Sequence, residues 1–353
     1  MIATKYSSLS YDVFIGIDVD KNSYSFTAKD HANMIISKKI PAQPEQLYNY
    51  MTKRFSTNRI LCAYEAGPTG LHLFDYLSER NIQCLVLSPF SIPKAPGATV
   101  KNNRIDSEAI AQHLKSGEAT PVRVPHGHYR DLRHLVKVRE NYARDRMVAK
   151  QRIKALLLLE NLHTSDPQMS WSARYIATLK TIPCKSATRI HLDALIEDLE
   201  YARTHLLTIL KQLRTFCKEH ADIEQNINYL DSIPGIGFIC AVSILGKTGG
   251  PDNLHSLIEL ASFAGLTPTE YSTGDTVSHG RISHHGDQTL RFLLIEAAWV
   301  SIRHDKELNQ FYYRIKSRHH PKIGAKKAIT AVARKLTQRI YRVLKEQRNY
   351  TVR

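Results

Sequence analysis

Three acidic residues and one amide stand where they could share a divalent cation. Asp18 lies at the end of an apolar stretch, FIGIDVD, and Glu65 ends a second one in LCAYEAGPTG. Asp106 opens an expected helix in KNNRIDSEAIA, and Asn103 stands three residues before it. Carboxylate and amide oxygens suit Mg²⁺, which acts as a Lewis acid in phosphodiester chemistry. The pattern therefore favours a metal-dependent, nuclease-type site.

Each of these residues also has an ordinary structural explanation. An aspartate at a strand end is often a turn residue, and Asp106 alone could place a favourable negative charge at a helix N-terminus. Asn103 could cap the same helix, because asparagine and aspartate are nearly equal as caps. Two carboxylates about 4 Å apart repel by roughly 4 kcal/mol at an effective dielectric constant near 20. Convergence of the three acids would therefore require a cation.

The elements expected around these residues form a mixed sheet. VFIGIDV, SYSFTAK and MIISKKI within residues 13–40 are strand-like, and buried strands are expected at RILCAYE and QCLVLS. Helices are expected at residues 44–55 and 69–79. Strands that first meander and then alternate with helices indicate an α/β domain with helices on the faces of its sheet. We expect a ribonuclease H-like domain over residues 1–125.

Residues 126–222 are predicted to form a helical, coiled-coil hairpin. Basic residues mark a first helix from residue 129 to about 163, and a second is expected from about 188 to 218. Apolar residues of the second helix recur with coiled-coil spacing: Leu192, Leu195, Leu199, Leu206, Leu210, Leu213 and Cys217. We expect this seam to join copies of the chain, with a plain helical bundle as the alternative. Residues 164–187 are expected to be irregular.

Residues 223–353 are expected to form a mainly helical domain that contacts nucleic acid. LDSIPGIGFICAVSILGKTG predicts two apolar helices around a turn resembling a helix-hairpin-helix. Gly235 and Gly237 in this turn would let the backbone approach a phosphate, although such turns also occur without a ligand. A loop rich in Gly, Ser, Thr and His is expected at residues 267–286, before a basic helical end.

The charge distribution favours a nucleic-acid partner. The 353-residue chain has a net charge of +16; residues 303–353 contain 15 basic and 3 acidic residues, against 13 and 11 in residues 1–120. A local excess of this kind favours phosphate neutralisation, and a solvated basic helix is the alternative. No apolar run could span a bilayer, no leader is recognised, and the five scattered cysteines form no CxxC pair. We expect a cytoplasmic protein with reduced, mostly buried cysteines.

The motifs, taken in order, resemble those of the DEDD transposases of the insertion-sequence-one-ten family, which includes the Piv-type pilin-gene invertases. They are GIDVDK, YEAGPTG, KNNRIDSEAIAQHL, IPGIG, FAGLTPTEYSTG, RISHHGDQTLR and KKAITAVARKL, and they span nearly the entire chain. The resemblance implies an N-terminal fold like that of Holliday-junction resolvases, a coiled coil for assembly, and a C-terminal domain with a serine nucleophile. Actin-like ATPases share the Gly-Ile-Asp strand, but their further phosphate loops are not recognised here.

The resemblance also implies residue roles. Asp18 and Glu65 match the first two acids of the DEDD tetrad, Asp106 matches the fourth, and Asn103 replaces the third. The nucleophile position, directly before a glycine, is Thr273 rather than serine, with Ser272 just upstream. Without the resemblance, Ser-Thr-Gly is an ordinary turn. Candidate nucleic-acid contacts are Gly235, Gly237, Arg281, Arg291, Lys326, Lys327, Arg334 and Lys335. Arg281 and Arg291, near the nucleophile loop, could equally be surface charges.

The implied function is DNA transposition by strand cleavage and rejoining, with Mg²⁺ or Mn²⁺ as cofactor. Insertion-sequence members are guided by a bridge RNA that pairs with donor and target DNA. The implied partners are therefore DNA, a structured guide RNA and further copies of the chain, as a dimer or as a tetramer on DNA, at the bacterial nucleoid. Two alternatives stay open: a domesticated RNA-guided DNA-binding protein, silenced at Asn103 and Thr273, and a Piv-like invertase that acts at fixed sites.

Overall fold

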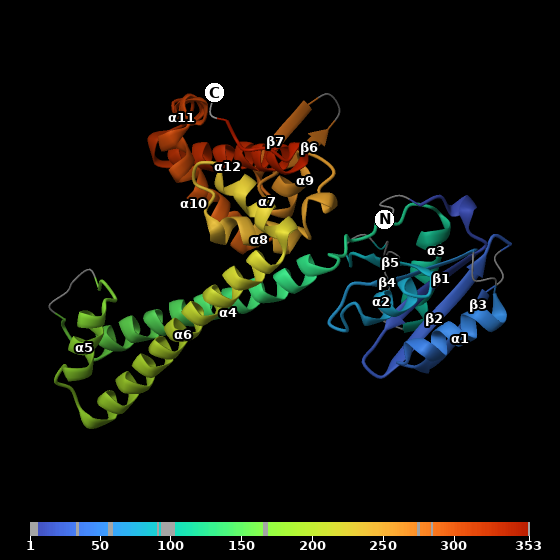
Figure 1. Ribbon diagram of the computed structural model, residues 1–353, viewed down its shortest axis with the longest axis horizontal. Helices are drawn as coiled ribbons and strands as arrows, with labels where there is room; N and C mark the ends of the chain where they lie inside the picture. The colour runs from blue at the N-terminus through green and yellow to red at the C-terminus, as the bar shows by residue number, and fades with distance from the viewer. Residues whose placement is uncertain are drawn as a thin grey trace. The chain divides into compact units, whose positions relative to one another are not determined.

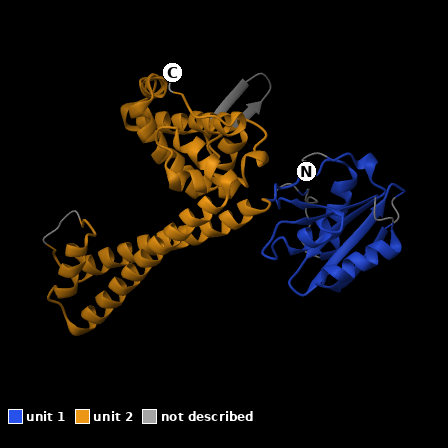
Figure 2. Cartoon of the chain, viewed as in Figure 1, with its two compact units in different colours: residues 1–124 blue, residues 125–353 orange. Residues whose placement is uncertain are grey.

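The structure, a computed structural model, describes residues 6–32, 35–55, 59–89, 92, 103–164, 169–273, 276–283 and 285–351. The chain divides into two compact units, residues 1–124 and residues 125–353 (Figure 2). The first unit contains a five-stranded sheet, and the second is mainly helical (Figure 1). Within these described ranges, no helix is both long enough and apolar enough to cross a membrane.

The sheet of the first unit is mixed, with the strand order β3-β2-β1-β4-β5. Strand β2 pairs antiparallel with β1 and β3, whereas β4 lies parallel between β1 and β5. The predicted α/β sheet is confirmed. The strands are β1 (Val13–Val19), β2 (Ser23–Asp30), β3 (Ile35–Pro41), β4 (Ile60–Glu65) and β5 (Gln83–Leu87).

Both faces of this sheet are covered, because both alternating sets of side chains in β1 and β4 are apolar. Ile15 and Ile17 belong to the face covered by α1 (Pro44–Arg54) and α2 (His72–Ser78). Phe14 and Leu61 belong to the other face, which is covered by α3 (Asn103–Lys115). Gly16 lets α3 come close, since a Cβ at this position would lie 2.1 Å from the Ser107 carbonyl oxygen.

The second unit begins with a hairpin of two long helices, α4 (His128–Leu159) and α6 (Ser186–Glu219), with the short α5 (Ala173–Thr181) at its far end (Figure 1). The two predicted helices are confirmed. The prediction that residues 164–187 are irregular is wrong for α5. Ser172 caps this helix by accepting a hydrogen bond from the Tyr175 N–H at 3.1 Å, and Tyr175 and Leu179 are buried against the hairpin.

The predicted seam on α6 is filled by α4 of the same chain. Leu192 and Leu199 belong to one buried cluster with Ile153 of α4, and Leu213 belongs to another with Val136. The expectation that this stripe joins two copies is therefore wrong, because its apolar surface is already covered within the chain.

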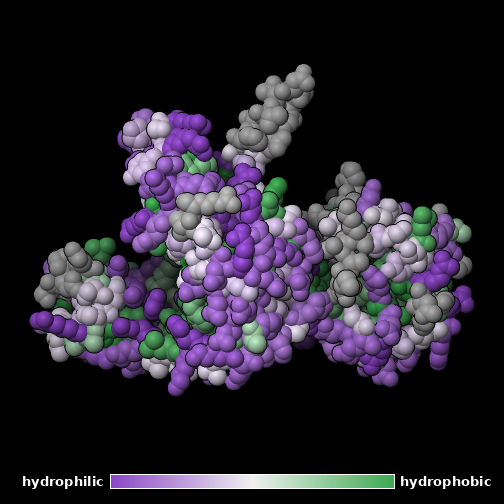
Figure 3. All heavy atoms as spheres, turned by 45° about the horizontal axis from the view of Figure 1, so that its top comes forward, coloured by the Kyte–Doolittle hydropathy of each residue, from purple (hydrophilic) through white to green (hydrophobic). Residues whose placement is uncertain are grey.

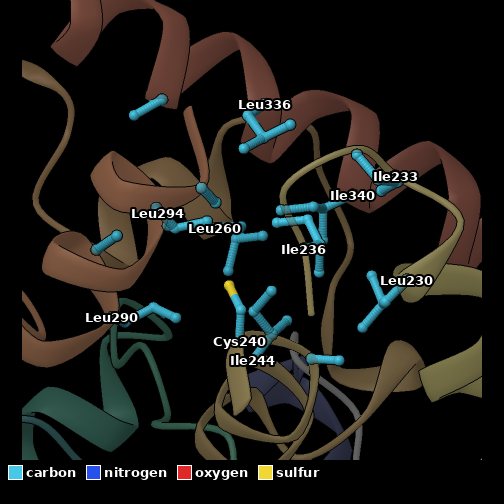
Figure 4. Close-up of a cluster of buried hydrophobic side chains, with 14 of the residues drawn as sticks. Leu230, Ile233, Ile236, Cys240, Ile244, Leu260, Leu290, Leu294, Leu336 and Ile340 are labelled. Carbon is cyan, nitrogen blue, oxygen red and sulfur yellow. The ribbon is translucent and has the colours of Figure 1, made fainter. Parts of the chain in front are cut away.

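The rest of the second unit surrounds one large apolar core. Figure 4 shows side chains from several helices and their connections converging on it, among them Leu230, Cys240, Leu260, Leu290 and Leu336. The helices are α7 (Ala221–Asp231), α8 (Phe238–Thr248), α9 (Glu259–Phe263), α10 (Gln288–His304), α11 (Lys306–Lys316) and α12 (Pro321–Glu346). The mainly helical character expected of this region is confirmed, with α7 and α8 on either side of the Pro-Gly-Ile-Gly turn.

Residues 267–286 are not the expected loop, because β6 (Pro268–Thr273) and β7 (Thr276–Ile282) pair in an antiparallel hairpin. Their Thr, Tyr, Val and Ile residues favour strands over loops. Four of the five cysteines are buried, as expected. The described surface in Figure 3 is mainly hydrophilic, with scattered apolar residues.

Candidate functional site

Asp18 and Glu65 lie at the same edge and on the same face of the sheet. Strands β1 and β4 run parallel with Ile17 opposite Tyr64, so Asp18 and Glu65 are the next residues along the two strands. Both are in step with the side chains that face α3, because successive residues of a strand alternate between faces. Asp18 is half-buried and Glu65 is exposed.

Helix α3 points its N-terminus toward this edge. Ser107 Oγ lies 2.9 Å from Thr27 Oγ1 of β2, and further along the helix Gln112 Oε1 accepts a hydrogen bond from Lys29 Nζ at 3.2 Å. On β2 the step from Thr27 to Lys29 leads away from the residue paired with Asp18. The helix therefore runs away from the Asp18 edge, and its first turn lies nearest to it.

That first turn carries the other two predicted residues. Asp106 precedes the buried Ile110 by four residues, and Asn103 precedes the buried Ser107 by four, so both lie on the side of α3 that faces the sheet. Asp106 is half-buried and Asn103 is exposed. The fold thus brings all four predicted residues to one edge of one unit.

Carboxylate and amide oxygens suit a hard divalent cation, so the donor set fits Mg²⁺ or Mn²⁺ in kind. In the part of the chain that the structure describes, however, no three His, Cys, Asp or Glu side chains stand close enough to hold a metal ion. The backbone positions the donors at one edge, but their side chains do not form a closed cluster.

A polar network that sequence reasoning missed fixes α3 on the sheet. Lys29 Nζ lies 3.1 Å from Glu108 Oε1, with the Lys29 side chain only 9% exposed. Together with the Thr27–Ser107 contact, this ion pair holds β2 and the helix that carries Asp106 in one register. The signal was available in SYSFTAK, where Ser25, Thr27 and Lys29 put polar groups on one face of a strand that is otherwise apolar.

The predicted nucleophile region lies in the second unit. Ser272 and Thr273 end β6, and Thr273 is paired with Thr276 of β7, but both side chains lie outside the described residues. The base of this β-hairpin is held where the Ser283 N–H donates to the Thr267 carbonyl oxygen at 2.9 Å.

Of the two glycines predicted to contact phosphate, one packs against protein and the other is exposed. Gly235 has a φ of +93°, and a Cβ there would lie 2.3 Å from the Ala297 carbonyl oxygen of α10. The close approach that this glycine permits is therefore to α10. Gly237 is exposed at the N-cap of α8, and a Cβ there would meet no heavy atom of the described chain within 4 Å.

The predicted basic contacts differ in availability. Arg281, Lys326 and Lys327 are exposed, and Arg334 is half-buried. Arg291 donates from Nη1 to the Ala264 carbonyl oxygen at 3.0 Å, which fixes the loop after α9, and Lys335 forms an ion pair with Glu307.

Arg339 of α12 belongs to the basic excess of residues 303–353. Its side chain is buried in a network with acidic residues. It pairs with Asp305 and with Glu307, and it donates a hydrogen bond to Tyr350. Burial alone would raise the pKa of Asp305, but hydrogen bonds from Tyr350 and from the Leu308 N–H, together with the Arg339 charge, hold that pKa below its ordinary value. This network is structural.

Comparison with known proteins shows the family. Residues 15–161 match the family model for DEDD transposases of the IS110 type, described as a transposase, and residues 227–313 match the model described as transposase IS116/IS110/IS902 family. The chain belongs to the IS110 family of transposases. The first match covers the sheet with Asp18, Glu65 and Asp106, and the second covers the glycine turn and both nucleophile candidates. The resemblance seen in the motifs is confirmed.

Individual members of the family are similar over most of the chain. It is 26% identical to the transposase for insertion sequence element IS1328 of Yersinia enterocolitica, over 92% of the chain and 94% of that protein. It is 23% identical to the pilin gene-inverting protein of Moraxella bovis, over 96% of the chain and 98% of that protein. It is 29% identical to the putative transposase y4qE of Sinorhizobium fredii over 67% of the chain, and spans only 57% of that protein.

Proposed function

We propose that the chain is a DNA recombinase that cuts and rejoins DNA at positions selected by a bridge RNA. The observation that carries the proposal is the placement of Asp18 and Glu65 at adjoining positions of parallel strands, on the face that meets the N-terminal end of α3. The strand order β3-β2-β1-β4-β5 is typical of ribonuclease H-like folds and supports assigning the first unit to them. Membership of a transposase family supports DNA as the substrate.

The four residues at this edge are the proposed metal ligands. Asp18, Glu65 and Asp106, with the Asn103 amide, would hold Mg²⁺ or Mn²⁺, which when bound supplies Lewis-acid polarisation of a phosphodiester. Because Asn103 replaces a carboxylate, the site has one negative charge fewer than a four-acid site. The Lys29–Glu108 ion pair positions α3, and with it Asp106, rather than touching the DNA.

Thr273 is the proposed nucleophile. Its hydroxyl oxygen would attack the scissile phosphorus while the phosphorus–oxygen bond to one deoxyribose breaks, and the hydroxyl proton would end on the released sugar oxygen. The phosphodiester formed between Thr273 and the DNA conserves the free energy of the broken bond, so strands can be exchanged and rejoined without ATP. We assign the carboxylates to one copy of the chain and the hydroxyl to another, which makes an oligomer necessary.

A covalent adduct tests this proposal. The chain is incubated with the DNA that flanks its gene, with the RNA that co-purifies with it, and with Mn²⁺. Denaturing gels are then searched for a protein–DNA adduct. Thr273→Ala and Asp18→Asn should abolish it, whereas Ser272→Ala should retain it. Thr273→Ser should equal or exceed the wild type, because it removes a methyl group that restricts the hydroxyl. An adduct that peptide mass maps to another residue would contradict the assignment of Thr273.

The same assay tests whether Asn103 belongs to the metal site. Asn103→Asp adds an anionic oxygen, so Mn²⁺ should bind more tightly in calorimetry, and adduct formation should rise by roughly 10²–10³-fold, the effect typical of one preorganised electrostatic element. If Asn103 only caps α3, both quantities should stay unchanged, because Asn and Asp cap helices almost equally.

A second candidate is inversion of DNA at fixed sites. The observation that favours it is the likeness to the pilin gene-inverting protein along nearly the whole of both chains. Adduct formation that needs no RNA would support the invertase. Tight binding of RNA and DNA with no adduct, even in Asn103→Asp with Thr273→Ser, would support a silenced DNA-binding protein.

A further inference from the structure

The middle of the helical hairpin carries a group of positive charges that form no ion pair with any described residue. On α4, Arg139, Arg146, Lys150 and Lys154 follow at steps of seven, four and four residues, so they lie along one face of the helix. Arg203 of α6 adds a fifth charge, which acts on Lys150. We call these five residues the hairpin cations. Throughout the described chain, none of the five forms an ion pair.

The hairpin cations stand where an ordinary helical hairpin would have apolar contacts. One buried apolar cluster reaches along α4 as far as Val136, and the next begins at Ala149. Opposite the stretch of α4 between Val136 and Ala149, α6 continues to bury apolar side chains. On that stretch of α4 itself, Arg139 and Arg146 are half-buried. Long basic side chains can cover apolar surface with their stems while their charged ends stay at the water boundary. The positive charges therefore lie close together along the contact between α4 and α6.

This arrangement is unfavourable for the chain alone. Lys150 stands four residues from both Arg146 and Lys154, a spacing at which like charges destabilise a helix. Burial, followed by the charges of Arg146, Arg203 and Lys154, lowers the pKa of Lys150. Two acids on the same helices form ion pairs with other residues: Glu140 Oε1 lies 2.8 Å from Lys247 Nζ, although its charge also acts on Arg139, and Glu200 Oε1 lies 2.8 Å from Lys180 Nζ. The repulsion would be relieved by an external polyanion.

We propose that the hairpin cations bind the phosphate backbone of a nucleic-acid duplex. From Arg139 to Lys154 the row is about 22 Å long at 1.5 Å per helical residue. Over such a length a duplex presents one negative charge roughly every 1.7 Å, so a straight row of cations can meet several phosphates. The proposal goes beyond the proposed function, and it rests on that function only for the kind of ligand.

The composition of the row favours a duplex over a single strand. Binding of unpaired strands usually combines cations with aromatic rings on which bases stack. The rings beside the row are engaged with protein. Trp171 packs edge-on against Tyr175, with Lys150 Nζ and Lys154 Nζ 5.2 Å and 6.0 Å from its centroid. Tyr142, four residues before Arg146, stacks on His205 of α6 with centroids 5.2 Å apart. A row that offers charge rather than stacking contacts the backbone and is independent of sequence. Paired DNA and the stems of a guide RNA share this chemistry.

The test compares two double variants of the full-length chain. Arg146→Gln with Lys150→Gln removes two hairpin cations. Arg152→Gln with Lys211→Gln is the matched control, because it also removes one Arg and one Lys from the hairpin, both exposed, with Arg152 two residues beyond Lys150 and so on the opposite side of α4. Fluorescence anisotropy measures binding to a labelled DNA duplex of about 20 base pairs and to an RNA hairpin of similar length, over a range of salt.

We expect the first variant to bind at least one duplex about tenfold more weakly, with a salt slope reduced by roughly 1.8, since each lost phosphate contact removes about 0.9 from it. The control should keep the wild-type slope. A loss confined to the RNA hairpin assigns the row to guide RNA, and a loss confined to the DNA assigns it to DNA; both support the proposal. Circular dichroism checks that the variants remain helical.

Three outcomes would overturn the proposal. Equal losses in both variants would mean that only net charge matters. Unchanged affinity and slope in the first variant, with normal binding by the wild type, would refute the site on the hairpin and leave the recombinase function intact. Failure of the wild type to bind either duplex would refute both the site and the proposed function.

Discussion

Helix α12 and the middle of the hairpin are both rich in Lys and Arg, but they use these residues differently. On α12, Arg339 is buried among Asp305, Glu307 and Tyr350, and Lys335 is paired with Glu307. On the hairpin, none of the five cations forms an ion pair within the described residues. A local count of charge therefore does not locate the positive charge that is available to a ligand.

This difference changes how the basic C-terminal region is interpreted. Two of its cations, Lys335 and Arg339, form ion pairs within the chain, so the contacts proposed there rest mainly on exposed residues such as Lys326 and Lys327. The hairpin, in contrast, contains cations that raise the energy of the chain when no ligand is bound. Arg339 and Lys335 thus have acidic partners, whereas the hairpin cations, which are the proposed phosphate contacts, form no ion pair within the described residues.

The largest effect that would test this comparison is expected at Arg339. Arg339→Met leaves Asp305 buried without its charged partner, because the Asp305 side chain is only 1% exposed. We expect the free energy of unfolding to fall by about 3–5 kcal/mol. The control Lys335→Met breaks a partly exposed pair and should cost less than about 1 kcal/mol. Urea unfolding measures both, followed by tryptophan fluorescence in a Trp171→Phe background so that Trp299 of the C-terminal core is the sole reporter. Equal, small costs would contradict a structural role for Arg339.

The second effect is a loss of stability in acid. The pKa of Asp305 lies below its ordinary value, so its contribution is complete above the pKa of the unfolded chain, near 4, and is lost as the pH falls through the folded value. Hydrogen bonding by Lys335 lowers the pKa of Glu307, which acts in the same direction. The advantage of the wild type over Asp305→Asn should be about 1–3 kcal/mol at pH 6 and should shrink below pH 4. An advantage independent of pH would mean that the Asp305 charge does not matter.

The elements that sequence predicts well are those whose signals are local. VFIGIDV and RILCAYE have the apolar runs of buried strands, and each ends near a carboxylate that is costly to bury unpaired. Asp18 and Glu65 could therefore be placed at one sheet edge before the structure was known. The direct pairing of the two strands is a finding of the structure, because β2, β3 and α1 separate them in the chain. The roles of Asp18 and Glu65 as ligands stay predictions, since no group of three donors is closed among the described residues.

The features that sequence could not predict depend on partners distant in the chain. The apolar stripe of α6 is visible in its spacing, but only the fold decides that α4 covers it rather than a second copy. Arg339 resembles any other basic residue of its helix until Asp305, 34 residues away, is placed beside it. Helix α5 is short and starts at a local cap, Ser172, so it has no long periodic signal.

The smallest expected effect is a change in the free energy of unfolding at Arg146, and it tests the hairpin alone. Arg146→Met removes a charge that lies four residues from Lys150 but keeps an apolar stem of similar length in the seam. At low salt we expect the free energy of unfolding to rise by roughly 0.2–0.5 kcal/mol, because a like-charge pair at this spacing is removed. The gain should disappear near 1 M salt, where the screening length falls to about 3 Å.

Arg152→Met, on the opposite side of α4, is the control and should change stability within error at both salt concentrations. Urea unfolding at the two concentrations provides the comparison. A loss of more than about 1 kcal/mol in Arg146→Met would mean that Arg146 has a stabilising partner like that of Arg339, and the contrast between the two regions would fail.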